Sequence, residues 1–488
     1  MMSAHAFLGC PPQSPPGIQD LVHNEEKRTQ ASASRSEASE KVLASRDLHA
    51  LQNVASMVMQ KKAKEVCLIG QGKIESHVTV GQIDLIYCLC DLDQVFAIIF
   101  EDGTDIVARI NGSRALQDSD KSQAEIVRRI QSEFATIKYI QANTTIPVPD
   151  IIYRDNNFDN DVGAPYSLQK RIIGRMISDI WPSKFNSSCM NGEQAVCAVK
   201  QIADFECQLS RLSNFDSIGC LEYDEVTNEF RVGPVTPLQK LSTLPEFYPG
   251  PWQSSIEYLR SLISTHKATL RQSDWLDNRR SFFTYMNKAN VPKIEDIDME
   301  ARSDHTHFIS WYNMLEANLD RLDLSPFDPP HYPFVLLHED LNIGNVMVDY
   351  EDPAKVVAVI DWEGSRVVPF WVGNFYSSFL NESDYSNDPK EQEIYHRMVE
   401  TRDETRKKNL DPSLWNENTI PVLRGLFNLY QLVSLPPTCI PVPLFNTLLQ
   451  NFLASRPQDE VDMFRPMLEL GLGHANEASK AMARRFGG

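Results

Sequence analysis

The stretch FVLLHEDLNIGNVMVDYEDPAKVVAVIDWEG, residues 334–364, sets two apolar runs beside a group of polar side chains. The first run ends at His338 and Asp340, Asn345 follows five positions after Asp340, and the second run ends at Asp361. Short apolar runs predict buried strands, and the ends of buried strands carry side chains into clefts. We therefore expect one short hairpin that presents these polar groups to a cleft.

The spacing His-x-Asp-x4-Asn followed by a second Asp suits phosphoryl transfer. That reaction needs positioning, a divalent metal and a carboxylate near the acceptor hydroxyl. Asp340 suits the role of the base, in a loop that His338 would brace. Asn345 and Asp361 offer hard oxygen ligands of the kind that Mg²⁺ takes. The spacing therefore predicts one base and two metal ligands.

The same residue types also occur in ordinary turns. Asp and Asn are frequent turn residues, so the alternative is a pair of plain strands with solvated ends. His338 alone would more often be a structural histidine of the core. The complete spacing favours the phosphoryl-transfer interpretation over this alternative.

Length and composition are those of a soluble globular protein with room for two lobes. The chain has 488 residues, 42% of them hydrophobic and 23% charged. The formal net charge of −19 argues against a nucleic-acid partner, because phosphate backbones need a basic face. An acidic surface would suit a cationic small substrate, although it more often serves solubility alone.

The nine cysteines have no repeating spacing, which favours reduced thiols in an intracellular protein. Cys88 and Cys90 form a close pair without a second pair, so we expect strand residues rather than a zinc site. No apolar run approaches the length of a membrane span, and the N-terminal residues resemble neither a signal peptide nor a presequence. We expect a cytoplasmic protein with no membrane partner; its oligomeric state stays open.

Element types divide the chain into a tail and two lobes. Residues 1–45 are rich in Pro, Ser, Ala, Glu and Arg, which predicts a disordered N-terminal tail. Residues 46–172 predict a β-meander plus a helix, and residues 173–488 predict a mainly helical lobe that includes the hairpin 334–364. The pattern is that of a bilobal α+β protein.

The expected elements follow from periodicity and turn residues. In the first lobe they are a short helix at 48–63, strands at 84–90, 94–100 and 104–110, a hairpin turn at 101–103, a helix at 122–142 and a strand at 165–174. In the second lobe they are helices at 193–212, 252–270, 307–322, 390–407, 420–435 and 443–454.

Two further clusters have alternative interpretations. The acidic run at 295–300 could line a pocket for a cationic acceptor, or could simply begin a helix, where acidic side chains are favoured. His305 and His307 could suggest a metal site, but they lack a third ligand nearby. We expect an exposed turn there.

The segments HEDLNIGN, residues 338–345, and IDWE, residues 360–363, resemble the aminoglycoside phosphotransferase (APH) family. The likeness is strongest to its fungal branch, within the protein-kinase-like superfamily. It implies a protein-kinase-like bilobal fold that binds ATP and Mg²⁺ between its lobes, with Asp340 as the base and Asn345 and Asp361 holding the metal. Asn342 stands where protein kinases usually have Lys, so the resemblance favours a small-molecule hydroxyl acceptor over a protein acceptor.

The resemblance extends upstream. FAIIFEDGTDIVARI, residues 96–110, is similar to two strands of the family, which makes Arg109 the candidate contact for the α- and β-phosphates. Glu133 matches the helix glutamate that orients this basic residue through an ion pair. PYSLQKRIIG, residues 165–174, resembles the interlobe hinge whose backbone receives the adenine, centred on Lys170 to Ile172. Without the resemblance, Arg109 and Glu133 would be interpreted as solvated charges.

Two features depart from the family pattern. The loop between the first two strands, counted as residues 90–94, has no glycine and carries two carboxylates, although such a loop should close over phosphates through backbone N–H groups. Glu339 stands where a small residue is usual. The leading hypothesis is an ATP-dependent small-molecule phosphotransferase. The alternative, motivated by the loop, is a pseudokinase-like binding or assembly protein with weak or no turnover.

Overall fold

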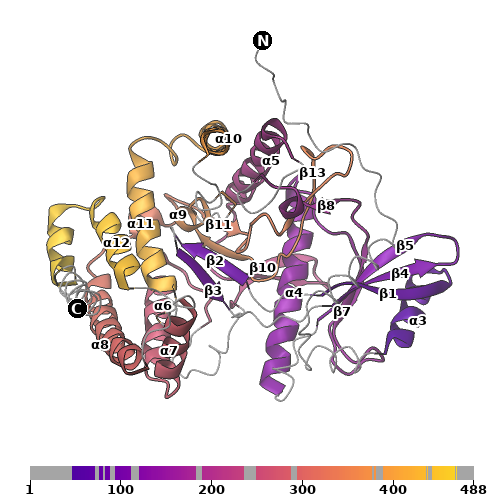
Figure 1. Ribbon diagram of the computed structural model, residues 1–488, viewed down its shortest axis with the longest axis horizontal. Helices are drawn as coiled ribbons and strands as arrows, with labels where there is room; N and C mark the ends of the chain where they lie inside the picture. Colours follow the sequence, from indigo (N-terminus) through magenta and orange to yellow (C-terminus); the bar gives the residue numbers. More distant parts are fainter. Residues whose placement is uncertain are drawn as a thin grey trace, which may run out of the picture.

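The computed structural model describes the chain in blocks. They are residues 47–71, 76–80, 83–87, 94–111, 120–182, 190–235, 249–286, 294–375, 379–380, 388–435, 437, 442–467 and 469. The predicted tail at 1–45 and the pair Cys88 and Cys90 lie outside these residues. The described blocks form an α+β protein with a small β-rich lobe and a larger, mainly helical lobe (Figure 1).

The small lobe is built on a five-stranded antiparallel sheet with the order β1-β4-β5-β7-β6. Its strands are β1 (Ala63–Gln71), β4 (Gln94–Phe100), β5 (Asp105–Ile110), β6 (Ile151–Asp155) and β7 (Tyr166–Lys170), and helix α3 (Leu48–Met59) packs against it. Gly103, with φ of 82°, turns β4 into β5, as the hairpin prediction required. Strand alternation in β5 buries Ile106, Ala108 and Ile110, which places Arg109 on the opposite face.

The predicted pairing at the start of the sheet is wrong. Residues 84–90 were expected to pair with 94–100, but β3 (Ile83–Tyr87) pairs with β2 (Ser76–Val80) in a separate two-stranded ribbon. The neighbour of β4 is β1, with Gln71 opposite Gln94. The segment that joins these sheet neighbours therefore runs from 72 to 93, and its sequence includes Gly72 and Gly81. The glycine-free residues 90–94 are only the end of this connection.

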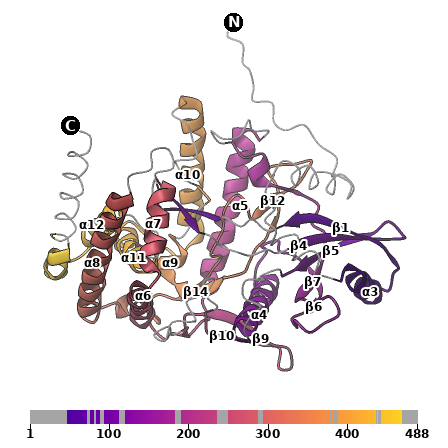
Figure 2. The ribbon, with the colours of Figure 1, turned by 60° about the horizontal axis from the view of Figure 1, so that its bottom comes forward.

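Helix α4 (Asp120–Asn143) links the two lobes. Its residues Ile137 and Ile140 belong to the core of the helical lobe. Beside it lies the hairpin of β9 (Cys220–Asp224) and β10 (Glu229–Gly233), as Figure 2 shows. Lys138 Nζ sits 4.1 Å from the centre of the Tyr223 ring, and this hairpin thereby holds the small-lobe helix from the side of the large lobe.

The strands that carry the polar groups of 334–364 belong to two sheets, so the expected single hairpin is a second error. β11 (Phe334–Leu337) pairs with β14 (Arg366–Pro369). β13 (Val356–Val359) pairs instead with β12 (Val346–Val348), which also pairs with β8 (Arg175–Met176). Both predicted runs are buried strands, but apolar runs alone do not state which strand pairs with which.

The large lobe contains most of the helices. They are α5 (Gly192–Arg211), α6 (Ser255–Leu270), α7 (Trp275–Met286), α8 (Ile294–Leu319), α9 (Phe370–Gly373), α10 (Pro389–Asn409), α11 (Thr419–Ser434) and α12 (Val442–Leu453), with short 3-10 turns at Ile177–Asp179 and Ser325–Phe327. Each helix predicted for this lobe overlaps one of these, but the predicted helix 307–322 covers only the second half of α8, and α7 was not predicted. Among the helices that the structure describes, none is long and apolar enough to cross a membrane.

Helix α8 decides between the two interpretations of the acidic run. The run begins this helix, and Asp298 forms ion pairs with Arg280 and Arg302, so it stabilises a helix end instead of lining a pocket. The exposed turn expected at 305–307 is wrong, because both histidines lie within α8. His305 Nε2 is 2.8 Å from Leu270 O, and His307 is buried with its ring 4.2 Å from that of Trp311.

A glycine at the lobe junction should be sensitive to substitution. A Cβ added at Gly174 would lie 2.6 Å from Val357 Cγ2 and 2.8 Å from Val348 O. Because one of these atoms belongs to the backbone, Gly174→Ala must displace β12 or β13, and we expect a loss of about 1–3 kcal/mol. A lower Tm by differential scanning fluorimetry would show it. Gly192→Ala is the control, since that Cβ meets only the Ile394 side chain, and equal Tm values for Gly174→Ala and the wild type would contradict the prediction.

Candidate active site

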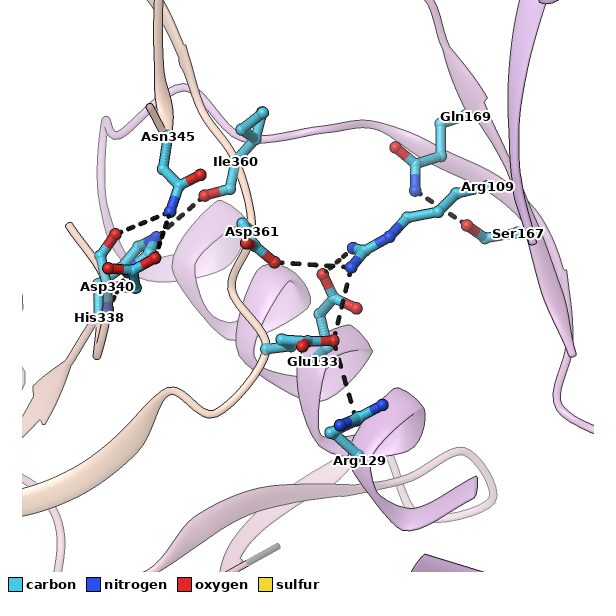
Figure 3. A network of polar contacts seen from close by, with 11 residues as sticks. Arg109, Arg129, Glu133, Ser167, Gln169, His338, Asp340, Asn345, Ile360 and Asp361 are labelled. Carbon is cyan, nitrogen blue, oxygen red and sulfur yellow. Dashed lines mark hydrogen bonds and ion pairs between the residues drawn. The ribbon is translucent and has the colours of Figure 1, made fainter. Parts of the chain in front are cut away.

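The Asp340 carboxylate is held by hydrogen bonds within its own loop (Figure 3). Asn342 Nδ2 donates to Asp340 Oδ1 at 2.7 Å. Asn345 Nδ2 donates to Asp340 Oδ2 at 3.1 Å and to Asp340 O at 2.8 Å. Asn342 Oδ1 in turn accepts from Gly344 N–H at 2.6 Å. The two asparagines therefore fix both the course of the loop and the direction of the carboxylate.

His338 braces this loop against the end of β13. Its Nδ1 lies 3.2 Å from the Asp340 N–H nitrogen, which donates to it, and its Nε2 lies 3.0 Å from Ile360 O. Since Nδ1 accepts, we assign the ring proton to Nε2, which donates to the carbonyl. The ring packs 4.5 Å from that of Trp362, and burial lowers the pKa of His338 to about 4. The imidazole is therefore neutral at pH 7 and serves as a spacer.

Burial also changes the Asp340 carboxyl. Burial raises the pKa of Asp340, while the hydrogen bonds from Asn342 and Asn345 act in the opposite direction because they favour the charged form. A raised pKa makes the carboxylate a better proton acceptor. The loop thus holds a fixed carboxylate with increased basicity.

Asp361 adopts an uncommon backbone conformation directly after β13. Its φ is 64°, a left-handed value that Asp tolerates better than most residues but that still costs conformational energy. The preceding Ile360 N–H donates to Asn345 O at 2.9 Å, which ties the Asp361 segment to the loop of the base. The two predicted metal ligands therefore stand on segments that are joined by a backbone hydrogen bond.

Arg109 reaches from β5 to α4 and to the turn after β13 (Figure 3). Its Nη1 is 2.6 Å from Glu133 Oε1, so the expected ion pair between strand and helix is present. Its Nη2 is 3.5 Å from Asp361 Oδ1 and 3.5 Å from Glu363 Oε2. These contacts bring residues that are far apart in the sequence into one cluster of charges.

The cluster contains two charges to which the sequence analysis gave no role, Glu363 and Arg129. Arg129 is buried, and its Nε is 3.8 Å from Glu363 Oε2. Arg129 precedes Glu133 by four positions, which places both on the same face of α4. This helical spacing, together with the position of Glu363 in the IDWE segment, is the signal that could have found them.

The hinge prediction needs one correction. The Lys170 N–H already donates to Asp150 O at 3.0 Å, and the Lys170 side chain pairs with Asp150 while 70% exposed. Lys170 therefore cannot give its N–H to an adenine. Ile172 lies past the end of β7, and no acceptor for its N–H is found among the residues that the structure describes. Ile172 is the better candidate for the adenine contact.

The donor atoms fit Mg²⁺ shared with phosphate oxygens. Because Asn345 uses its Nδ2 hydrogens on Asp340, its amide oxygen is the atom that suits a metal, and Asp361 adds one carboxylate that is 40% exposed. Mg²⁺ commonly takes one or two protein oxygens and completes its shell with phosphate and water. In the described part of the chain, no group of three or more His, Cys, Asp or Glu side chains could hold a metal. The residues present therefore suit a nucleotide-bound cation better than an all-protein metal cage.

Comparison with known proteins shows the family to which the chain belongs. The sequence model of the phosphotransferase enzyme family (APH) matches residues 107–372, more than half of the chain. The chain belongs to this family. The matched region contains every residue of the cluster around Arg109 and of the loop around Asp340. The expected relation to the aminoglycoside phosphotransferase (APH) family is thereby confirmed.

Two curated proteins with sequences similar to this chain come from fungi. A subtelomeric hrmA-associated cluster protein of Aspergillus fumigatus is 22% identical over 345 residues, which cover 62% of this chain and 61% of that protein. The altered inheritance of mitochondria protein 9 of Candida tropicalis is 27% identical over 306 residues, 57% of this chain and 46% of that protein. The chain thus spans less than two thirds of either relative.

Solved phosphotransferase structures were also matched over most of the chain. A thermostable mutant of an aminoglycoside phosphotransferase has a TM-score of 0.37 at 11% identity, covering 86% of this chain and 99% of that one. An amicoumacin kinase in complex with AMP-PNP and Ca²⁺ has a TM-score of 0.37 at 12% identity, covering 88% of this chain and 95% of that one.

The buried imidazole of His338 should make this protein sensitive to acid. The folded-state pKa of about 4 lies below the ordinary 6.5, so the unfolded chain binds the extra proton between these values. Stability should therefore fall as pH drops from about 6.5 to about 4, by up to about 3 kcal/mol for one such group. His338→Gln should reduce the difference in Tm between pH 7 and pH 4.5.

His266 provides a matched control for this prediction. It is also buried, with a pKa lowered by burial to about 4, but it lies in α6 away from the loop of Asp340. His266→Gln should flatten the same pH dependence of Tm. An unchanged Tm difference in His338→Gln would contradict the assignment of a neutral, buried imidazole.

Proposed function

We propose that this protein is an ATP-dependent phosphotransferase that moves the γ-phosphoryl group to a hydroxyl of a small molecule. The observation that carries the proposal is that two fixed groups lie on either side of Asp361 (Figure 3). One is the Asp340 carboxylate, held by Asn342 and Asn345. The other is the Arg109 guanidinium, held by Glu133 beside Asp361. Membership of the phosphotransferase enzyme family supports the reaction class.

The residues divide the reaction between them. The acceptor oxygen forms a bond to the γ-phosphorus while the bond from that phosphorus to the β,γ-bridging oxygen breaks, and ADP leaves. Asp340 takes the hydroxyl proton; a carboxylate has acceptor capacity beyond the two bonds that it already receives. Arg109 would face the phosphates, and Asn345 and Asp361 would hold Mg²⁺. Bound there, Mg²⁺ neutralises charge on the β- and γ-phosphates.

A small acceptor is preferred over a protein acceptor. Asn342 stands where protein kinases usually have Lys, and that difference favoured a small acceptor in the sequence analysis. Its side-chain amide donates to Asp340 and accepts from the Gly344 N–H. It therefore serves the base and the loop backbone. The net charge of −19 would favour a cationic acceptor, so amino-alcohols and aminoglycosides belong in the same screen as sugars.

The pseudokinase-like alternative is kept as the second proposal. It rested on a glycine-free loop at 90–94, but the connection between the neighbouring strands β1 and β4 spans 72–93 and contains Gly72 and Gly81. The glycine-free stretch is therefore only part of that connection. Catalysis is accordingly the function that we propose.

Removal of either carboxylate should stop turnover. Asp340→Asn removes the proton acceptor and Asp361→Asn removes the charged metal ligand, so each should lower kcat by about 10²–10⁴-fold. ADP release measured with Mg-ATP against amino-alcohols, sugars and aminoglycosides would identify the acceptor and test the variants. Asp352→Asn, an exposed residue of the turn between β12 and β13, should keep wild-type turnover. Full activity in Asp340→Asn would disprove the proposed role.

Arg109 should couple metal binding to nucleotide binding. Its Nη2 lies 3.5 Å from Asp361 Oδ1, so the guanidinium competes with a divalent cation for this carboxylate until phosphates draw it away. Mn²⁺ should bind the free protein weakly and the AMP-PNP complex more tightly, by about tenfold or more. Arg109→Met should bind Mn²⁺ alone more tightly than the wild type does, while its AMP-PNP affinity falls.

Electron paramagnetic resonance of Mn²⁺ and calorimetry with AMP-PNP would measure both affinities without turnover. Arg231→Met is the control, because Arg231 pairs with Glu222 within the β9–β10 hairpin. If Arg109→Met left the affinity for Mn²⁺ unchanged, Arg109 would not screen Asp361.

A cytoplasmic location remains a proposal. It rests on the sequence features described above, and the relatives named altered inheritance of mitochondria protein 9 carry the word mitochondrial in their names. Fractionation of cells that express the full chain would decide between the two compartments.

A further inference from the structure

A charged pair lies next to the proposed base. Glu339 directly precedes Asp340, and Arg366 is the first residue of β14. Arg366 Nη2 donates to Glu339 Oε1 at 2.5 Å, and the side chains are only 17% and 22% exposed. Neither residue has a part in the phosphoryl transfer described above, although the pair stands one residue from its centre.

The Glu339–Arg366 pair connects the two segments of the chain just past the end of the β11–β14 pairing. β11 and β14 are antiparallel, and their ladder ends with Leu337 opposite Arg366. The chain then leaves the sheet for the loop of the base, where no further rung holds it. By reaching Glu339, Arg366 fixes the chain two positions past the end of β11. The direction in which the loop departs is thereby set immediately before Asp340.

Together with His338, the pair ties the loop of the base to both sides of Asp361. His338 contacts Ile360 O, directly before Asp361. Glu339 contacts Arg366, five positions after Asp361. Two consecutive residues of the loop, His338 and Glu339, thus contact the chain before and after Asp361.

Arg366 is itself anchored in the helical lobe. Its Nη2 lies 3.3 Å from the hydroxyl of Tyr430, a buried residue of α11 whose ring lies 6.1 Å from that of Tyr258 in α6. A guanidinium held in this way loses less conformational freedom on pairing than one on an exposed surface. It also supplies the positive charge that offsets repulsion between the neighbouring carboxylates of Glu339 and Asp340.

We propose that Glu339 and Arg366 form a positioning pair that holds the Asp340 carboxylate in place for proton transfer. The proposal rests on the function proposed above. Both residues act through Asp340, and neither touches the reacting atoms. Loss of the pair should therefore slow the chemical step while leaving nucleotide binding nearly unchanged.

The test compares five variants of the full chain, one of which is the conservative variant Arg366→Lys. Arg366→Met and Glu339→Gln each leave the charge of the other residue without its opposite charge, whereas the double variant removes both charges. Arg406→Met is the matched control, because Arg406 forms a comparably buried pair with Glu206 at 2.8 Å, between α10 and α5, with side chains 8% and 12% exposed. Hydrogen–deuterium exchange of residues 338–345 in the nucleotide-free protein is measured beside kcat and the KM for ATP.

The proposal predicts a split between these quantities. Arg366→Met should lower kcat by about 10–100-fold, because small misplacements of a reacting group are costly, and the KM for ATP should stay within about threefold. Exchange at 338–345 should rise. The double variant should be less impaired than Arg366→Met, and Arg366→Lys should recover part of kcat. Arg406→Met should lower Tm without either effect.

Several outcomes would overturn the proposal. They are an unchanged kcat with unchanged exchange in Arg366→Met, a rise in the KM for ATP in place of a fall in kcat, or an equal loss of kcat in Arg406→Met. Failure of the proposed function would look different, because the wild type and Asp340→Asn would then both release no ADP. In that case the exchange data still decide whether the pair holds residues 338–345.

Discussion

The Arg109 guanidinium connects three segments that the chain keeps far apart. It lies on β5, pairs with Glu133 on α4, and faces Asp361 and Glu363 in the turn after β13. Charges that are largely shielded from water are stable only when they are paired and hydrogen-bonded. Each of these elements must therefore keep its place for the cation to be satisfied. These ion pairs thus restrain the small lobe, helix α4 and the large lobe relative to one another.

Helix α4 carries this arrangement into the large lobe. Its apolar residues belong to the core of that lobe, and the β9–β10 hairpin packs aromatic rings and charges along its side. Arg154 of β6 lies over the Phe134 ring and pairs with Glu225, so the strand, the helix and the hairpin meet at one point. Movement of α4 would therefore disturb both the ion pair of Arg109 and the packing between the lobes.

The segment around Asp340 is fixed by a different kind of constraint. The buried strand β11 leads into this segment. Beyond the end of the strand, side-chain hydrogen bonds hold the segment in place of backbone pairing. His338 and Glu339 hold the outside of the loop, and Asn342 and Asn345 hold its inside. A carboxylate surrounded in this way needs little reorganisation before it accepts a proton, and such preorganisation is a large part of how enzymes lower barriers.

Local patterns in the sequence determined much of the fold. Most helices followed from their apolar spacing, although α7 and the first half of α8 were not predicted. The turn at Gly103 followed from its residues, and the loop around Asp340 from a motif that spans eight residues, 338–345. The errors concerned long-range pairing. Residues 83–87 pair within their own ribbon, and Phe334–Leu337 pairs with a strand that follows Asp361. An apolar strand specifies that it is buried, but not beside which neighbour.

The sequence by itself determined which residues could do chemistry, because the types and spacing of His338, Asp340, Asn345 and Asp361 state their possible roles. Only the tertiary structure decided which charges meet. It placed Arg129 and Glu363 beside Arg109, engaged the N–H of Lys170 within the sheet, and set Arg366 against Glu339. The physical reason is that ion pairs act over a few ångströms in space, between residues whose separation along the chain carries no information about that distance.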